Sequence, residues 1–217
     1  KINIQHSKFL KQSSYIEASE EFSKVKNDLR LKANIMEVYT YYKYKSYDMV
    51  IEKIHIIRKN HKEQLSKKND LYLRYIEGIS YYHQMSNFKA SQDISKMAFN
   101  NFFKLASQES DNKWREDAIE KLDEITERIS SNYIYLAKYH IKTESFISAL
   151  MALNKAADNI YSNHHKPEAL LRLAEVYYYL GMKDRSQEMI EKLFKDYDKK
   201  NKWVKYAVEL ENKIVKK

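Results

Sequence analysis

Two tyrosine-rich stretches carry the side chains best suited to binding another polypeptide. In EVYTYYKYK the rings at positions 39 and 42 are three residues apart, and in YLRYIEGISYYHQ those at 72, 75 and 82 are three and seven apart, which places each group on one helix face. Rings offer a large contact area at low entropic cost, and their hydroxyls fix orientation. The predicted peptide-binding residues are Lys32, Tyr39, Tyr42, Lys43, Tyr72, Tyr75, Tyr82 and His83. This set favours an extended peptide with aromatic side chains and a carboxylate end. Alternatively, the rings only cover neighbouring helices or reflect codon bias.

A second set near the end of the chain mixes charges and rings. It consists of Arg172, Glu175, Tyr178, Tyr179 and Arg185. Most of these residues fall on one face of a single predicted helix. The equivalent face of earlier helices carries the first set, and here both signs of charge are present. We therefore predict a second, more charge-balanced docking surface for a partner protein.

Nothing in the sequence resembles a catalytic or metal-binding motif. There is no cysteine, no glycine-rich phosphate loop, no G-x-S-x-G and no H-E-x-x-H. The adjacent acids of Glu116-Asp117 point to different faces of a helix, which makes them a poor acid/base pair. The pair His164-His165 is expected in a solvent-exposed loop. We predict a protein that is not an enzyme and has no cofactor or metal.

The elements that must position these side chains follow a repeated ladder. In each unit a small or apolar residue precedes a ring by three positions and a second small or apolar residue by twelve, and apolar anchors follow four and seven residues later; in the third unit an insertion of eight residues delays the second half. The clearest unit is Ala174, Tyr177, Ser186, Ile190 and Leu193, with Gly181 as its turn. The other units are His6, Phe9, Ala18, Phe22, Val25; Val38, Tyr41, Val50, Ile54, Ile57; Gly78, Tyr81, Ala98, Phe102, Leu105; and Ala137, His140, Ala149, Leu153, Ala156.

This ladder predicts an all-α fold, an α-α superhelix of about five tetratricopeptide-like hairpins closed by a C-terminal capping helix over 203–215. A non-repetitive helical bundle is the alternative. The third unit contains an insertion over 86–95, and the fourth begins with one long helix over 113–142. Residues 59–69 are polar and basic, and we expect a loop there with Asp70 capping the next helix.

Charge is distributed unevenly. The net charge is +9, of which residues 1–108 carry +8 and residues 109–217 carry +1. The basic half either attracts an anionic partner, such as a carboxylate, lipid headgroups or nucleic acid, or is only a solvated lysine-rich surface. No apolar run is long enough to span a bilayer. Because the chain starts at Lys1, we expect a processed product whose export signal lies upstream.

The arrangement of these units resembles one family. The insertion in the third unit, the long helix from Trp114, and the segments YLRYIEGISYYHQ, REDAIEKLDEITERISSNYIYLAKYHIK and EALLRLAEVYYYLG together are similar to the BamD (YfiO/ComL) outer-membrane assembly lipoproteins. Each segment alone is shared with tetratricopeptide proteins in general. The insertion and the long helix, each in the appropriate unit, make the resemblance specific, and it covers nearly the whole chain.

The resemblance implies a non-catalytic periplasmic adaptor held on the outer membrane by a lipid anchor upstream of Lys1. Residues 109–217 would bind the POTRA region of BamA, and residues 1–108 would bind unfolded outer-membrane β-barrel precursors, within one continuous solenoid. Other assembly lipoproteins are possible partners, and nucleic acid is not. At Tyr178 the sequence departs from the basic residue expected to contact BamA, and Arg172 or Arg185 would take its place.

A cytoplasmic peptide-sensing regulator or a general protein-protein scaffold could be built from the same repeats. Such a regulator usually carries a DNA-binding domain before its repeats, whereas an assembly lipoprotein carries a signal peptide and a lipid-modified cysteine. The segment upstream of Lys1 would distinguish the two.

Overall fold

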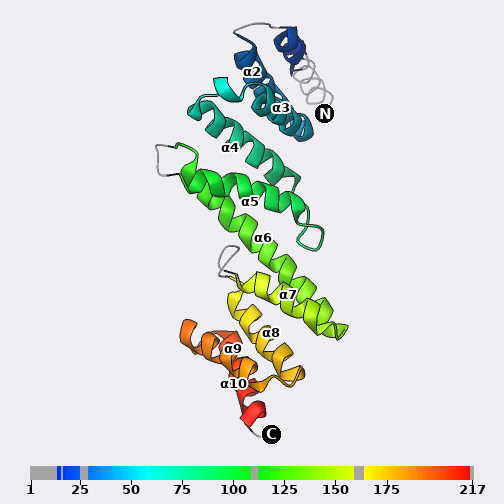
Figure 1. The fold of residues 1–217 in the computed structure, drawn as a ribbon, viewed down its shortest axis with the longest axis vertical. Coiled ribbons are helices and arrows are strands. Elements are labelled where there is room, and N and C mark those ends of the chain that lie inside the picture. The colour runs from blue at the N-terminus through cyan, green and yellow to red at the C-terminus, as the bar shows by residue number, and fades with distance from the viewer. Residues whose placement is uncertain (1–13, 16, 25–28, 109–111, 159–163, 216–217) are drawn as a thin grey trace, which may run out of the picture. The chain divides into compact units, whose positions relative to one another are not determined.

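The described part of the chain is helical throughout (Figure 1). The structure is a computed structural model and describes residues 14–15, 17–24, 29–108, 112–158 and 164–215. Its elements are α2 (Arg30–Lys43), α3 (Tyr47–Asn60), the 3-10 turn η2 (Lys62–Gln64), α4 (Lys67–Gln84), α5 (Asp93–Ala106), α6 (Arg115–Lys142), α7 (Phe146–Ala157), α8 (Lys166–Tyr179), α9 (Lys183–Asp196) and α10 (Lys202–Val215). Successive helices pack on one another, as predicted for a tetratricopeptide-like α-α superhelix. Much of the predicted first hairpin lies outside the described residues.

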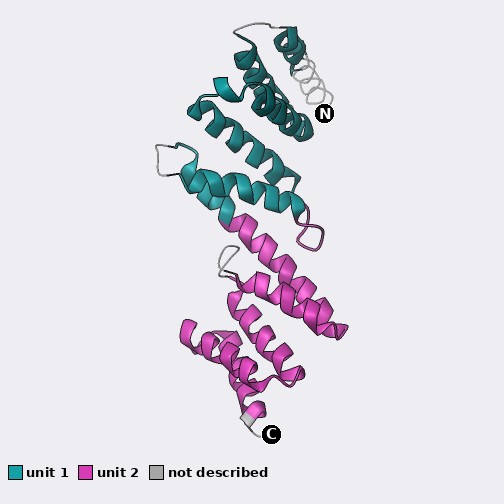
Figure 2. Ribbon diagram, viewed as in Figure 1, with its two compact units in different colours: residues 1–85, 93–122 teal, residues 86–92, 123–217 magenta. Residues whose placement is uncertain are grey.

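Two compact units divide the chain (Figure 2). Unit 1 comprises residues 1–85 and 93–122, and unit 2 comprises residues 86–92 and 123–217. In unit 1, α2 packs on α3, α3 on α4, and α4 on α5. In unit 2, α7 packs on α8, α8 on α9, and α10 on both α8 and α9. The division at residue 108 by binding partner stays a prediction.

The ladder residues form the core, as the repeat pattern predicts. Small residues sit where paired helices cross, and the apolar anchors fill the space beside them. In the second unit of the ladder, Val38, Val50, Ile54 and Ile57 are all 0% exposed. The same holds for Ala137, Ala149, Leu153 and Ala156, and for Ala174, Ser186, Ile190 and Leu193. Alternation of small and branched residues therefore determines where each hairpin closes.

Three hairpins close with the same turn. Lys45, Glu144 and Gly181 adopt positive φ angles of 62°, 55° and 74°. In each case the next residue donates its backbone N–H to a carbonyl five residues back: Ser46 to Tyr41 at 3.0 Å, Ser145 to His140 at 2.8 Å, and Met182 to Tyr177 at 2.9 Å. These bonds satisfy carbonyls that the helix end would otherwise leave unpaired.

The connection between α3 and α4 differs from the prediction. A loop over 59–69 was expected, but α3 continues to Asn60 and α4 already begins at Lys67. The cap is Ser66, whose hydroxyl accepts the Asn69 N–H at 3.3 Å, and not Asp70. Asp70 instead lies in the first turn of α4, where its charge suits the helix dipole.

The inserted segment is also shorter than predicted. It ends at Gln92, because α5 begins at Asp93. The Gln92 amide donates to the carbonyls of Asn87 and Ala90 at 3.2 and 2.9 Å, and thereby closes a compact loop. Within unit 2 the Asn132 amide of α6 donates to the Phe88 carbonyl at 2.6 Å.

Candidate functional site

Four tyrosines from α2 and α4 form what we call the phenol cluster: Tyr39, Tyr42, Tyr72 and Tyr75. Burial raises the pKa of Tyr72 to about 12, and the phenols of Tyr39 and Tyr42 add to this effect. Burial likewise raises the pKa of Tyr75 to about 12, with further contributions from Asp117 and Tyr42. The packing of α2 and α4 on α3 therefore brings together side chains that are about thirty residues apart in sequence.

Trp114 supports one side of the cluster. The ring of Tyr75 stacks on Trp114 with centroids 5.8 Å apart, and the ring of Tyr72 lies 6.0 Å from the same indole. Tyr75 also meets Phe102 edge-on at 6.4 Å. These contacts hold the rings in defined orientations, so the hydroxyls are fixed before any ligand arrives.

Cations and an imidazole extend this surface along α4. His83 stacks on Tyr47 at 5.2 Å and meets Tyr82 edge-on at 5.9 Å. The Lys121 ammonium lies 5.0 Å from the centre of the Tyr82 ring. Burial lowers the pKa of His83, and the charges of Lys45 and Lys121 lower it further. The result is a positively charged corner beside a row of rings.

The sequence-predicted residues of unit 1 are partly exposed. Tyr39 is 42% exposed, and the Lys43 ammonium lies 5.2 Å from its ring centre. The rings of Tyr42, Tyr72 and Tyr82 are half-buried. Lys32 is exposed on α2, two helical turns before Tyr39. Their role in peptide binding stays a prediction.

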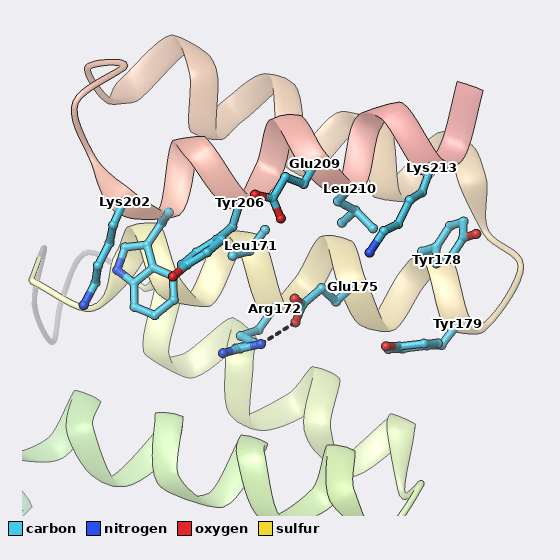
Figure 3. A pocket seen from close by; sticks show the side chains of 11 residues that line it. Leu171, Arg172, Glu175, Tyr178, Tyr179, Lys202, Tyr206, Glu209, Leu210 and Lys213 are labelled. Atoms are coloured by element: carbon cyan, nitrogen blue, oxygen red, sulfur yellow. Dashed lines mark hydrogen bonds and ion pairs between the residues drawn. The ribbon is translucent and has the colours of Figure 1, made fainter. Parts of the chain in front are cut away.

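A hollow of about 420 Å³ opens between α8 and α10 (Figure 3). From α8 it is lined by Leu171, Arg172, Glu175, Tyr178 and Tyr179, and from α10 by Lys202, Trp203, Tyr206, Glu209, Leu210 and Lys213. Both signs of charge and several rings face the same space, which gives a surface that can bind a mixed-charge polypeptide.

Arg172 is already engaged within this hollow. Its Nη1 donates to Glu175 Oε2 at 2.8 Å, its Nε lies 3.9 Å from the buried Glu168, and its guanidinium lies 5.9 Å from the Trp203 ring centre (Figure 3). Tyr179 stacks on Phe146 at 6.0 Å at the rim. Arg185, which we grouped with these residues, does not line the hollow and instead lies over Tyr177 at 5.9 Å.

Neither a metal cluster nor a membrane span occurs in the described ranges. No three His, Asp or Glu side chains there are arranged to hold a metal ion. Likewise, none of the helices there combines the length and apolar character that crossing a membrane requires.

The sequence of the chain is similar to those of known proteins. Residues 4–193 match the model of the YfiO family, described as outer membrane lipoprotein. The chain belongs to this family. It is also 23% identical over 206 residues to the outer membrane protein assembly factor BamD of Rickettsia prowazekii, covering 93% of this chain and 80% of that protein. It is 20% identical over 116 residues to the BamD of Caulobacter vibrioides, covering 54% of this chain and 38% of that protein.

The family match ends within α9, so α10 lies beyond it. Sequence reasoning treated α10 only as a cap and missed its contribution to the hollow. It also missed Tyr47, Trp114, Asp117 and Lys121 around the phenol cluster. For Trp114 a signal was present, since the apolar periodicity of α6 begins there, one turn before the buried Ala118.

Proposed function

We propose that the chain is a non-catalytic adaptor in the assembly of outer-membrane proteins. Membership of the YfiO family supports this role, and so do two relatives that are both named outer membrane protein assembly factor BamD. In this role the protein acts at the periplasmic face of the outer membrane, attached by a lipid anchor upstream of Lys1. It works by holding other polypeptides, for which stacked hairpins provide extended surfaces.

The phenol cluster is the proposed site for an unfolded β-barrel precursor, and it is the observation that carries this proposal. The phenols of Tyr72 and Tyr75 both interact with that of Tyr42, and Trp114 braces their rings. Lys43, and the lysines Lys45 and Lys121 beside His83, add positive charge. Aromatic side chains of an extended segment would contact the rings, and its terminal carboxylate would lie near the cations.

The test variant lacks two tyrosine hydroxyls of the phenol cluster but keeps their rings. Because Tyr75 packs on Trp114 and Phe102, alanine there would damage the fold, so we choose Tyr42→Phe with Tyr75→Phe. Two hydrogen bonds of ordinary strength correspond to a loss of affinity of about tenfold or more. The ligand is a fluorescent peptide with alternating aromatic residues and a free C-terminal carboxylate, titrated by anisotropy.

The matched control is Tyr81→Phe with Tyr139→Phe, since both tyrosines lie outside the cluster. The control should bind as the unchanged protein does. An amidated peptide should bind more weakly than the free acid. Equal affinity of the two double variants would reject the cluster as the peptide site.

The hollow between α8 and α10 is the proposed docking surface for the POTRA region of BamA. Its alternating charges and its rings from two helices support this assignment. Arg172 serves chiefly to hold Glu168 and Glu175 in place, so a partner would contact the more exposed side chains of α10.

Tyr206→Ala with Lys213→Glu should weaken binding of a purified POTRA region by about tenfold or more in calorimetry, because a ring and a charge leave the surface together. Lys205→Glu with Val208→Ala changes exposed residues of the same helix outside the hollow and should leave affinity unchanged. If both variants bind alike, the hollow is not the docking surface, whatever the peptide titration shows.

A further inference from the structure

Four exposed lysines gather on the connection between α3 and α4, and we call them the lysine edge: Lys59, Lys62, Lys67 and Lys68. Residues 59–69 contain these four cations and a single acid, Glu63. None of the four lysines forms an ion pair with any residue that the structure describes. Their charge is therefore directed to solvent and not used within the fold.

The helix order explains why the charge is concentrated. Lys59 lies in the last turn of α3, Lys62 in η2, and Lys67 and Lys68 in the first turn of α4, so all four lysines lie within ten residues at the junction of α3 and α4. Since α4 and α5 are antiparallel neighbours, Lys104 in the last turn of α5 lies at the same edge. A cluster of this kind produces a local potential that the charge-balanced second half of the chain lacks.

Apolar side chains accompany the cations. Leu29, at the start of α2, is 63% exposed, and Ile56, one turn before the end of α3, is 40% exposed. Lysines with interspersed exposed aliphatic residues are typical of surfaces that rest on anionic lipid, where the cations meet phosphates and the apolar groups enter the interface.

Other anionic partners fit this edge less well. A single-stranded nucleic acid would need aromatic platforms, but residues 58–68 contain no Tyr, Trp or Phe. Phosphate-specific recognition favours the forked guanidinium of arginine, and Arg58, the one arginine of this stretch, is held by Asp70 and Glu77. Lysines act as point charges and suit a diffuse layer of phosphates better than a single fixed group.

We propose that the lysine edge binds the surface of an anionic phospholipid bilayer. Lys68 lies one helical turn before Tyr72 on α4, so the edge adjoins the phenol cluster, and the variants below separate vesicle binding from peptide binding. Four lysines alone give a weak, salt-sensitive attachment that reinforces a separate anchor rather than replacing it.

The experiment measures co-flotation of the chain with phosphatidylcholine vesicles that contain about one third phosphatidylglycerol, at about 0.1 M and about 0.5 M salt. Binding should require the anionic lipid and should be lost at the higher salt. Each lysine near such a surface contributes roughly fivefold and the factors multiply, so the four glutamine substitutions together should reduce binding by up to about six hundredfold. The test variant is Lys59→Gln, Lys62→Gln, Lys67→Gln and Lys68→Gln.

A control variant removes the same net charge from scattered exposed lysines of unit 2 and should float as the unchanged chain does. It is Lys142→Gln, Lys183→Gln, Lys195→Gln and Lys205→Gln. Tyr42→Phe with Tyr75→Phe should also retain vesicle binding, which separates this test from the peptide titration. Circular dichroism of each variant verifies that the helices are intact.

Four results would overturn the proposal. The first is that the unchanged chain does not float with anionic vesicles. The second is equal loss in the two lysine variants, which would assign binding to net charge alone. The third is displacement by inorganic phosphate at matched ionic strength, which would indicate a discrete phosphate site. The fourth is tighter binding of a single-stranded oligonucleotide or of polyglutamate, lost in the same variant, which would assign the edge to that partner.

Discussion

Replacing Arg58 with methionine should be among the most damaging single changes in unit 1. Its Nη1 lies 2.6 Å from Glu77 Oε2, and its Nε lies 3.3 Å from Asp70 Oδ1, so one guanidinium on α3 holds two carboxylates of α4. Glu77 is only 4% exposed. Methionine fills a similar volume but leaves the buried carboxylate with His55, whose Nε2 is 3.3 Å away.

Loss of one partner from a buried ion pair costs about 3–5 kcal/mol of unfolding free energy. For a chain of this length that corresponds to a fall in Tm on the order of 10 °C. Removing both charges is far less costly, so adding Glu77→Gln to Arg58→Met should restore more than half of the loss. Far-UV circular dichroism during thermal and urea unfolding of the two single variants and the double variant measures this coupling.

Arg185→Met is the control, because Arg185 is exposed and has a ring contact but no ion pair with a described residue. It should change stability by less than about 1 kcal/mol. The reasoning would be refuted if Arg58→Met were equally mild, or if the double variant were no more stable than Arg58→Met alone.

Three further predictions address the turns and the titratable groups. Gly181 has φ +74° and no atom within 4 Å of an added Cβ, so Gly181→Ala should cost about 1 kcal/mol of backbone strain in urea unfolding, and Gly181→Asn should cost less. Tyr72 and Tyr75 keep their protons in the folded state to a pKa of about 12, against 10 when unfolded. Their contribution to stability is therefore complete below pH 10 and is lost as the pH rises towards 12. In ultraviolet difference spectra, Tyr72→Phe should reduce the phenol signal that titrates near pH 12. Because Lys121 contributes to the lowered pKa of His83, Lys121→Gln should move that pKa back towards 6.5 in an NMR titration, and an unchanged value would show that Lys121 has no part in the shift.

The hairpin core could be predicted because its requirements are local and repeated. A small side chain is needed wherever two helices cross closely, and branched anchors are needed one and two turns later. Gly78 illustrates the first requirement: an added Cβ would lie 3.1 Å from the Asn101 Cβ and 3.3 Å from the Phe102 ring. Such positions recur at fixed spacing, so five units in order reinforce one another.

Helix boundaries were harder to predict, since several residues can serve the same purpose. Ser66 and Asp70 are both good caps four residues apart, and the structure uses Ser66 while Asp70 pairs with Arg58 and Arg74. Likewise, the positive φ at Lys45 and Glu144 has no glycine to signal it. There the tertiary packing of the hairpin imposes a backbone conformation that the residue itself does not favour.

The surroundings of the candidate sites depend on contacts between distant segments, which periodicity alone does not reveal. The spacing of the tyrosines in α2 and α4 predicts a face that carries rings. Trp114 contacts that face only because α6 begins beside α4. The sequence shows which side chains a helix displays and leaves open which other helix will cover them.

The hollow between α8 and α10 likewise depends on which helix covers another. A terminal hairpin leaves an apolar face exposed, and Val204, Ala207 and Leu210 of α10 are buried in covering it. Their three-residue spacing turns one narrow stripe of α10 inward, so Tyr206, Glu209 and Lys213 remain beside the stripe and project over α8 (Figure 3). Capping by a single helix cannot fill the whole width of the hairpin, and the hollow is what it leaves open. The hollow is thus a geometric consequence of closing the stack. A partner that docks there, as we propose, would meet side chains of α10, which lies beyond the residues that match the family.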